Sequence, residues 1–252
     1  MWRGRRKALG KIEGRNPVIE AIRAEHEIDS IVIANGAQGS VKKIVAMAKE
    51  KGILVKYVDK KKLDELAPGE NHQGVIAFVS EYGYSELEDV LSKVEKEGRS
   101  PFIIILDGIT DPHNLGAIIR TADASGADAI VIPKRRSVGI TSTVVKSSAG
   151  AVEYVPVCRV TNLVSTIKML KENGVWVAAL DMGGQDLHKS NLQGSIALVV
   201  GSEGEGVSRL VKENCDFTVS IPMKGRVSSL NASVAAGVVM YEVLRQRGDS
   251  EG

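Results

Sequence analysis

One stretch near the C-terminal end organises the predicted fold, and it reads Ile221-Pro-Met-Lys-Gly-Arg-Val-Ser-Ser-Leu-Asn-Ala-Ser-Val-Ala-Ala-Gly237. An apolar strand that begins at Phe217 leads into it, and its small residues predict a helix from about Asn231. Where a strand of an α/β sheet runs through a polar loop into a helix, such folds commonly bind ligands. Ser229 and Asn231 are therefore candidate site residues, although both residue types also favour the N-cap of a helix.

The composition is that of an ordinary globular protein. Of its 252 residues, 43% are hydrophobic and 25% are charged, and the net charge is only +2. Any polyanion would therefore bind local basic patches, such as those at residues 1–11, 60–62 and 134–136, rather than the bulk charge. No signal peptide or membrane-spanning run is present, which predicts a cytoplasmic protein without a membrane partner.

The cysteines and histidines do not predict a metal site. Cys158 and Cys215 are far apart in the sequence and lack the spacing of metal ligands. They are predicted as buried free thiols in a reducing compartment. The four histidines form no paired ligand pattern either.

The hydrophobic pattern predicts two α/β domains. Residues 1–11 are predicted as a basic arm, 12–80 as a small N-terminal α/β domain, 81–100 as a linker and 101–247 as a larger domain. The linker contains a charged amphipathic segment, whose apolar positions are Leu87, Val90, Leu91 and Val94. In the larger domain strands are expected at 101–106, 129–132, 154–157, 175–180, 196–200 and 217–221. Helical stretches separate these strands, and that alternation predicts a mainly parallel sheet.

A second candidate loop follows the strand predicted at 101–106. It contains Asp111-Pro-His-Asn-Leu-Gly-Ala-Ile-Ile-Arg-Thr-Ala122, in which Asn114 could cap a helix. The apolar face of that helix leaves Arg120 on another side. A guanidinium there suits a phosphate or an oxyanion, and an ordinary surface arginine is the alternative interpretation.

A third loop, Leu198-Val-Val-Gly-Ser-Glu-Gly-Glu-Gly-Val207, follows the strand predicted at 196–200. Its glycines, beginning at Gly201, have the order GxxGxG, which differs from the dinucleotide-binding order GxGxxG. Glu203 and Glu205 lie where a pyrophosphate would have to bind, and carboxylates would repel it. This loop therefore favours a nucleoside cofactor without phosphates.

All three loops follow strand ends of one predicted parallel sheet, so we expect them to meet at one edge. Their residue types form a site without histidine, cysteine or metal, which gives little support to nucleophilic hydrolysis. Transfer of an activated group to a nearby hydroxyl requires mainly orientation, and it fits these residues better.

The three quoted motifs, taken together and in this order, resemble those of the SpoU or TrmH-like branch of the SPOUT RNA methyltransferases. The N-terminal unit is also similar to the small RNA-binding domain of RlmB-type members, which methylate the ribose 2′-oxygen of a guanosine in 23S ribosomal RNA. The resemblance implies an α/β fold with a deep trefoil knot in its C-terminal domain. It also implies that the protein is an enzyme, that S-adenosylmethionine is the cofactor, that RNA is the substrate and that the chain forms a homodimer.

The same resemblance assigns roles to individual residues. It implies catalytic roles for Asn114, Arg120, Glu203, Ser229 and Asn231, and cofactor contacts for Gly201, Ile221, Met223 and Leu230. Because a guanidinium keeps its proton at neutral pH, an electrostatic role for Arg120 is easier to defend than that of a general base. The target is expected in RNA and not in DNA, because only RNA carries a 2′-hydroxyl.

Two other interpretations stay open from the sequence. The chain could methylate transfer RNA, since the same motifs serve that substrate, or it could be a ribosome-assembly or RNA-binding protein without catalysis. A small-molecule-binding α/β protein would leave the N-terminal unit unexplained. The sequence does not identify the modified nucleotide, or whether free RNA or an assembling particle is the substrate.

Overall fold

The computed structural model describes residues 10–23, 28–68, 71–79, 82–226 and 229–248. The chain divides into two compact units, one of Gly4–Gly83 with Val138–Ser142 and the other mainly of Tyr84–Ser137 and Thr143–Gly252. Most of the predicted basic arm lies outside the described residues. Its last two residues, Gly10 and Lys11, are described and belong to the first strand.

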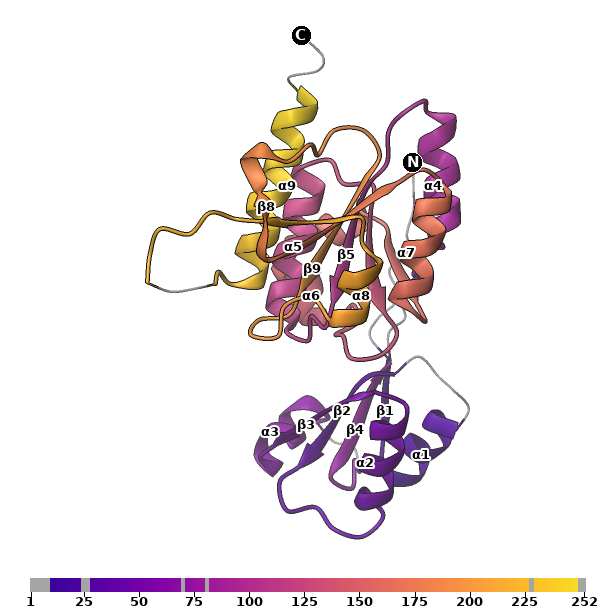
Figure 1. The fold of residues 1–252 in the computed structure, drawn as a ribbon. Coiled ribbons are helices and arrows are strands. Elements are labelled where there is room, and N and C mark those ends of the chain that lie inside the picture. Colours follow the sequence, from indigo (N-terminus) through magenta and orange to yellow (C-terminus); the bar gives the residue numbers. More distant parts are fainter. Residues whose placement is uncertain (1–9, 24–27, 69–70, 80–81, 227–228, 249–252) are drawn as a thin grey trace. The chain divides into compact units, whose positions relative to one another are not determined.

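The N-terminal unit is a four-stranded sheet covered by helices on both faces (Figure 1). Its elements are β1 (Gly10–Glu13), α1 (Arg15–Arg23), β2 (Ile28–Ala34), α2 (Val41–Glu50), β3 (Leu54–Val58), α3 (Lys60–Leu66) and β4 (Val75–Val79). The strand order is β1-β4-β2-β3; β4 runs antiparallel to β1 and β2, whereas β2 and β3 are parallel. Side chains alternate between the two faces of β2, so Ile31 and Ile33 pack with α1 and α2, whereas Val32 packs with α3.

The second unit is a six-stranded, fully parallel sheet of order β10-β8-β9-β5-β6-β7. Its elements are α4 (Leu87–Lys96), β5 (Phe102–Asp107), α5 (Pro112–Ala124), β6 (Ala129–Pro133), α6 (Ser142–Ser147), η1 (Ala151–Glu153), β7 (Val157–Val160), α7 (Leu163–Glu172), β8 (Trp176–Asp186), η2 (Leu187–Lys189), β9 (Ile196–Gly201), α8 (Arg209–Asn214), β10 (Phe217–Ser220) and α9 (Ala232–Gly248). The predicted parallel α/β sheet is confirmed.

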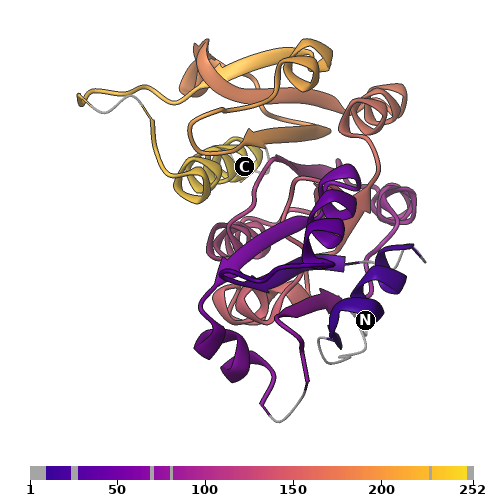
Figure 2. The ribbon, with the colours of Figure 1, turned by 90° about the horizontal axis from the view of Figure 1, so that it is seen from below.

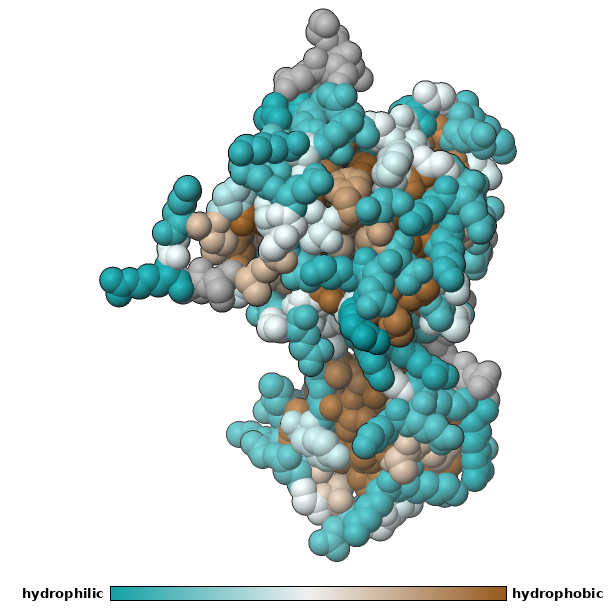
Figure 3. Space-filling view, in the orientation of Figure 1, coloured by the Kyte–Doolittle hydropathy of each residue, from teal (hydrophilic) through white to brown (hydrophobic). Residues whose placement is uncertain are grey.

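Helices cover both faces of this sheet, with α5 and α9 on one face and α4 and α7 on the other (Figure 1, Figure 2). The strand β5 is buried along 102–106, as its continuous apolar run predicts. Polar side chains cover most of the surface that is visible in Figure 3. Within the described residues, no helix is both long and apolar enough to cross a membrane.

Two elements differ from the sequence predictions. Residues 87–96, predicted as an amphipathic segment within a linker, form α4, and its buried Leu87, Val90 and Val94 belong to the core of the second unit. The strand predicted at 154–157 is β7 at Val157–Val160 instead, because residues 151–153 form the 3-10 helix η1. Both differences depend on which apolar residues pack against each other in the folded chain. A short apolar segment does not specify its packing partners.

The strand β8 continues beyond its predicted end at Leu180, and this extension shapes the site. Thr218 of β10 pairs with Ala179 of β8, but the next residue pairs with Gln185, so the intervening residues of β8 have no partner on β10. A Cβ at Gly184 would lie 2.6 Å from the carbonyl oxygen of Thr218, so only glycine allows this close approach. Of the residues without a partner on β10, Leu180, Asp181 and Met182 line the cavity described below.

Candidate active site

Three loops meet at the carboxyl edge of the parallel sheet, as the sequence predicts. They follow β5, β9 and β10 and lead into α5, α8 and α9, respectively. Two of them contact each other directly, since the backbone N–H of Ser208 donates a hydrogen bond of 2.8 Å to Oδ2 of Asp107. The convergence follows from topology, because the carboxyl ends of parallel strands all lie at one edge.

Glu203 joins side chains from all three loops. Its Oε1 accepts a hydrogen bond of 2.8 Å from Nδ2 of Asn114, and it also accepts from Nδ2 of Asn231. Asn231 Nδ2 donates as well to Oδ1 of Asn114 at 3.0 Å. The backbone N–H of Ala232, at the start of α9, lies 3.4 Å from the same glutamate oxygen. The positive end of a helix favours a carboxylate at that place.

Asn231 is a helix cap and a site residue at once. Its Oδ1 accepts hydrogen bonds from the backbone N–H groups of Ser233 and Val234, at 3.0 and 3.3 Å, and from the Ser233 hydroxyl. Its amide nitrogen is then left to bind Glu203 and Asn114. The helix cap that the sequence predicts for this residue type is present, and it leaves the amide nitrogen of Asn231 in the polar cluster.

Asn114 does not cap α5, contrary to our prediction. Asp111 is the N-cap, and its carboxylate accepts a hydrogen bond of 3.1 Å from the backbone N–H of His113. Pro112 occupies the first helical position, where its missing N–H costs nothing. With the cap supplied by Asp111, the side chain of Asn114 is available to Glu203.

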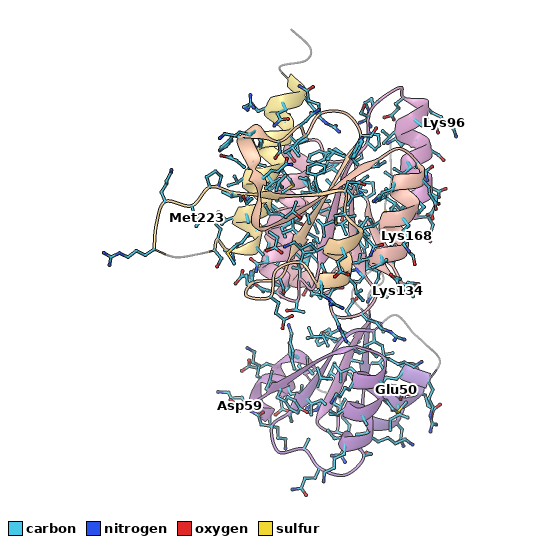
Figure 4. All side chains as sticks on the ribbon, viewed as in Figure 1. Glu50, Asp59, Lys96, Lys134, Lys168 and Met223 are labelled. Carbon is cyan, nitrogen blue, oxygen red and sulfur yellow. The ribbon has the colours of Figure 1, made fainter. Side chains whose placement is uncertain are left out.

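A cavity of about 320 Å³ lies beside this polar cluster. The predicted cofactor residues Gly201, Ile221, Met223 and Leu230 line it, and so do Glu203 and Ser229. Met223 lies on the loop that leaves the sheet after β10 (Figure 4). Val227 and Ser228, which precede Ser229 in the sequence, lie outside the described residues.

The lining suits a nucleoside cofactor without phosphates. Apolar groups from Val200, Leu230 and Ala235 form much of the wall, and the volume lies in the usual range for small-molecule sites. A Cβ at residue 201 would lie 2.0 Å from the carbonyl carbon of Gly206, so Gly201 lets the glycine loop fold back tightly at the cavity wall. S-adenosylmethionine, which has a flat aromatic adenine and no phosphate, fits this lining.

Sequence reasoning missed the contribution of β8. Leu180, Asp181 and Met182 line the cavity from the part of β8 that has no partner on β10. No motif marks these residues in the sequence. Gly183 and Gly184, which follow them, were the only available sign of an irregular strand.

Arg120 is not part of the polar cluster. It is exposed on α5, does not line the cavity, and makes no hydrogen bond or ion pair with the residues that the structure describes. It lies on the same helix as Asn114, six positions further along. The structure therefore joins four of the five predicted catalytic residues, namely Asn114, Glu203, Ser229 and Asn231, to the cavity or to its polar cluster.

Neither cysteine lines the cavity. Cys158 and Cys215 are both free, although Cys215 is only partly buried. Burial is the main cause that raises the pKa of each thiol to about 12, so both stay protonated at neutral pH. No group of three or more metal-ligating side chains occurs among the described residues.

Comparisons with known proteins identify the family of the chain. A model of the SpoU rRNA Methylase family matches residues 101–241, and a model for RNA 2′-O ribose methyltransferase substrate binding matches residues 11–85. The putative TrmH family tRNA/rRNA methyltransferase YacO of Bacillus subtilis is 50% identical over 237 residues, which cover 93% of this chain and 94% of that protein. A putative TrmH family tRNA/rRNA methyltransferase of Staphylococcus aureus is 51% identical over 241 residues, covering 94% and 96%.

A solved structure supports the cofactor as well. The AdoMet-bound rRNA methyltransferase from Sinorhizobium meliloti is 27% identical, and the match covers 94% of this chain and 87% of that chain with a TM-score of 0.59. The α/β-knot fold class predicted from the motifs agrees with this likeness. The chain belongs to the SpoU/TrmH family of RNA 2′-O-ribose methyltransferases, which use S-adenosylmethionine.

Proposed function

We propose that this protein methylates the ribose 2′-oxygen of a guanosine in 23S ribosomal RNA, and that it does so in the cytoplasm as a homodimer. The contact that carries the proposal is the cluster of Asn114, Glu203 and Asn231 beside the cavity. The likeness to an rRNA methyltransferase and the match of the N-terminal unit to a substrate-binding model favour ribosomal RNA. The free thiols fit a reducing compartment.

The site residues orient the acceptor hydroxyl. When bound, S-adenosylmethionine supplies an electrophilic methyl group. Glu203 Oε1 is held by the two asparagine amides, whereas Oε2 accepts no hydrogen bond from the described residues, so Oε2 is the oxygen left to receive the 2′-hydroxyl. Ser229 adds a further hydroxyl on the cavity wall. This arrangement holds the acceptor oxygen in place, which is the main requirement of the reaction.

Arg120 acts on the RNA in this proposal. Its exposed guanidinium binds the phosphate or ribose of the target nucleotide and helps to activate the 2′-hydroxyl for attack on the methyl carbon. Lys224 and Arg226, both exposed on the loop before α9, supply further phosphate contacts.

The homodimer is supported by α9, which is apolar on more than one side. Ala236, Val239, Met240 and Val243 are buried in the second unit. Val234, Val238, Tyr241 and Leu244 are apolar but exposed, and Val234, Val238 and Tyr241 follow the spacing of one helix face. A second copy of the chain would bury that face. Because α9 begins next to Asn231, the interface would lie near the site.

The test is methyl transfer from labelled S-adenosylmethionine to unmodified 23S ribosomal RNA and to transfer RNA in parallel. Alkali cannot cleave the linkage beside a 2′-O-methyl group, so the label should appear in an alkali-resistant dinucleotide from ribosomal RNA. Digestion to nucleosides should then yield 2′-O-methylguanosine. Label in transfer RNA alone would move the substrate to the second candidate. Label in a different 2′-O-methylnucleoside would refute the guanosine assignment.

A further inference from the structure

Asp181 lies in the cavity wall but belongs to none of the three motif loops. It follows Leu180, the last residue of β8 that pairs with β9, and it has no partner on β10. Its side chain is 22% exposed, so it is mostly enclosed while still reaching the cavity surface. A carboxylate in such a place requires polar partners, because an unpaired buried charge is costly.

Two contacts hold the Asp181 carboxylate in one orientation. Nζ of Lys212, on α8, donates to Oδ2 at 2.7 Å, and the backbone N–H of Met182 donates to Oδ1 at 2.7 Å. Gly206 packs beside this carboxylate, since a Cβ built there would lie 3.5 Å from Oδ1. The ion pair thus joins β8 to α8 at one edge of the cavity, next to Gly206 of the glycine loop.

The ion pair determines what this carboxylate can bind. Lys212 balances the negative charge of Asp181, so the carboxylate attracts a cationic group, such as an ammonium or a sulfonium, only weakly. A carboxylate oxygen can accept about two hydrogen bonds, and only one donor to Oδ1 is found among the described residues. Oδ1 can therefore accept one more hydrogen bond from a neutral donor in the cavity.

We propose that Asp181, oriented by Lys212, accepts a hydrogen bond from a ribose hydroxyl of the cofactor and makes cofactor affinity depend on that hydroxyl. The ribose carries two neutral hydroxyl donors, which match an acceptor whose charge is already balanced. Gly206 provides room because it lacks a side chain next to Oδ1. The proposal depends on the use of S-adenosylmethionine and not on the RNA substrate proposed above.

The experiment measures the affinity of the full chain for S-adenosylhomocysteine and for its 2′-deoxy and 3′-deoxy analogues by calorimetry. For the wild type, we expect at least one deoxy analogue to bind about 10-fold more weakly. We call the ratio by which a deoxy analogue binds more weakly than S-adenosylhomocysteine the deoxy penalty. Asp181→Ala should weaken S-adenosylhomocysteine binding about 10- to 100-fold, and its deoxy penalty should shrink to about twofold or less. Lys212→Met should weaken binding less and retain the penalty.

Two further variants keep the test decisive. Arg209→Met removes a cation from the same helix, where Arg209 pairs with exposed Glu213 and does not contact Asp181, so its affinities should equal those of the wild type. Asp181→Asn has nearly the same shape and should show a reduced deoxy penalty even if Asp181→Ala does not fold. If an Asp181 variant that melts cooperatively keeps the wild-type penalty, Asp181 only joins β8 to α8 and the proposal is wrong.

Discussion

Glu203 is the residue on which the polar cluster depends, because one of its oxygens accepts hydrogen bonds from two asparagine amides. Glu203→Gln keeps the size of the side chain but replaces a carboxylate with a neutral amide. Hydrogen bonds to a charged group are worth about 1.5–3 kcal/mol, so we expect methyl transfer to fall about 10- to 100-fold. Affinity for S-adenosylhomocysteine should change much less.

Glu205 offers a matched control for this measurement. It is an exposed glutamate of the same loop and also lines the cavity, but it makes no hydrogen bond or ion pair with another described residue. Glu205→Gln should therefore keep nearly full activity in the same assay. Equal losses in the two variants would contradict the special role of Glu203.

Arg120 makes a different prediction, because it lies outside the cavity and the polar cluster. Arg120→Ala should lower methyl transfer about 100-fold or more through the loss of transition-state stabilisation. Its affinity for S-adenosylhomocysteine, measured by calorimetry, should equal that of the wild type. Arg120→Lys should recover only part of the activity, since an ammonium lacks the planar fork of donors. Full activity in Arg120→Ala would remove this residue from the reaction.

Among the structural elements, the glycine loop after β9 depends on close backbone packing. Gly201→Ala would place a Cβ 2.0 Å from the carbonyl carbon of Gly206, and backbone atoms cannot give way as a flexible side chain can. We expect the free energy of unfolding to fall by about 1–3 kcal/mol and the affinity for S-adenosylhomocysteine to fall as well. Thermal unfolding and calorimetry measure the two effects.

The loop before α9 supplies the matched control for this glycine substitution. Among the described residues, no atom lies within 4 Å of a Cβ built at Gly225, and the φ of Gly225 lies outside the left-handed region. Gly225→Ala should therefore change the free energy of unfolding by less than about 0.5 kcal/mol. A similar loss in both variants would mean that close packing at Gly201 is not the cause.

The helix α9 contains a buried carboxylate whose titration links stability to pH. Hydrogen bonds from Arg245 are the main cause that lowers the pKa of Glu242 from 4.5 to about 2, and Gln246 also donates to it. Since the folded state has the lower pKa, this carboxylate stabilises the fold above pH 4.5, and the stabilisation is lost as the pH falls towards 2. Glu242→Gln should remove that pH-dependent part.

Urea unfolding between pH 7 and pH 2.5 measures this effect. The wild type should lose about 1–3 kcal/mol more unfolding free energy over this range than Glu242→Gln. Glu213, whose pair with Arg209 on α8 is exposed, serves as the control, and Glu213→Gln should follow the wild type. Parallel curves for Glu242→Gln and the wild type would show that the carboxylate does not stabilise the fold.

For the whole molecule, the exposed apolar side of α9 predicts the oligomeric state. Val238→Glu places a charge in the middle of the proposed interface, between Val234 and Tyr241. Burying an unpaired charge costs several kcal/mol, so the dimer should dissociate about 100-fold more readily. Sedimentation velocity at several concentrations measures this. Leu210→Glu, at an exposed position on α8, should leave the dimer intact, and a wild-type monomer would refute the proposal.

The parallel sheet and the meeting of the three motif loops could be predicted from the sequence, because both depend on patterns within short segments. Continuous apolar runs such as 102–106 mark strands buried on both faces. The ends of such strands share one edge, so Glu203 and Asn231 were expected to lie near each other before any contact was known. The motifs also indicated the family that the comparisons confirm.

The remaining features required the folded chain, because they are contacts between segments that are distant in the sequence. Leu87 and the rest of α4 belong to the core because the second unit offers them apolar partners. Asn114 is free to bind Glu203 because Asp111 already caps α5. Asp181 reaches the cavity because β10 shifts its register on β8, and its ion pair with Lys212 joins residues 31 positions apart. Local periodicity carries no information about such pairings, since tertiary packing selects them.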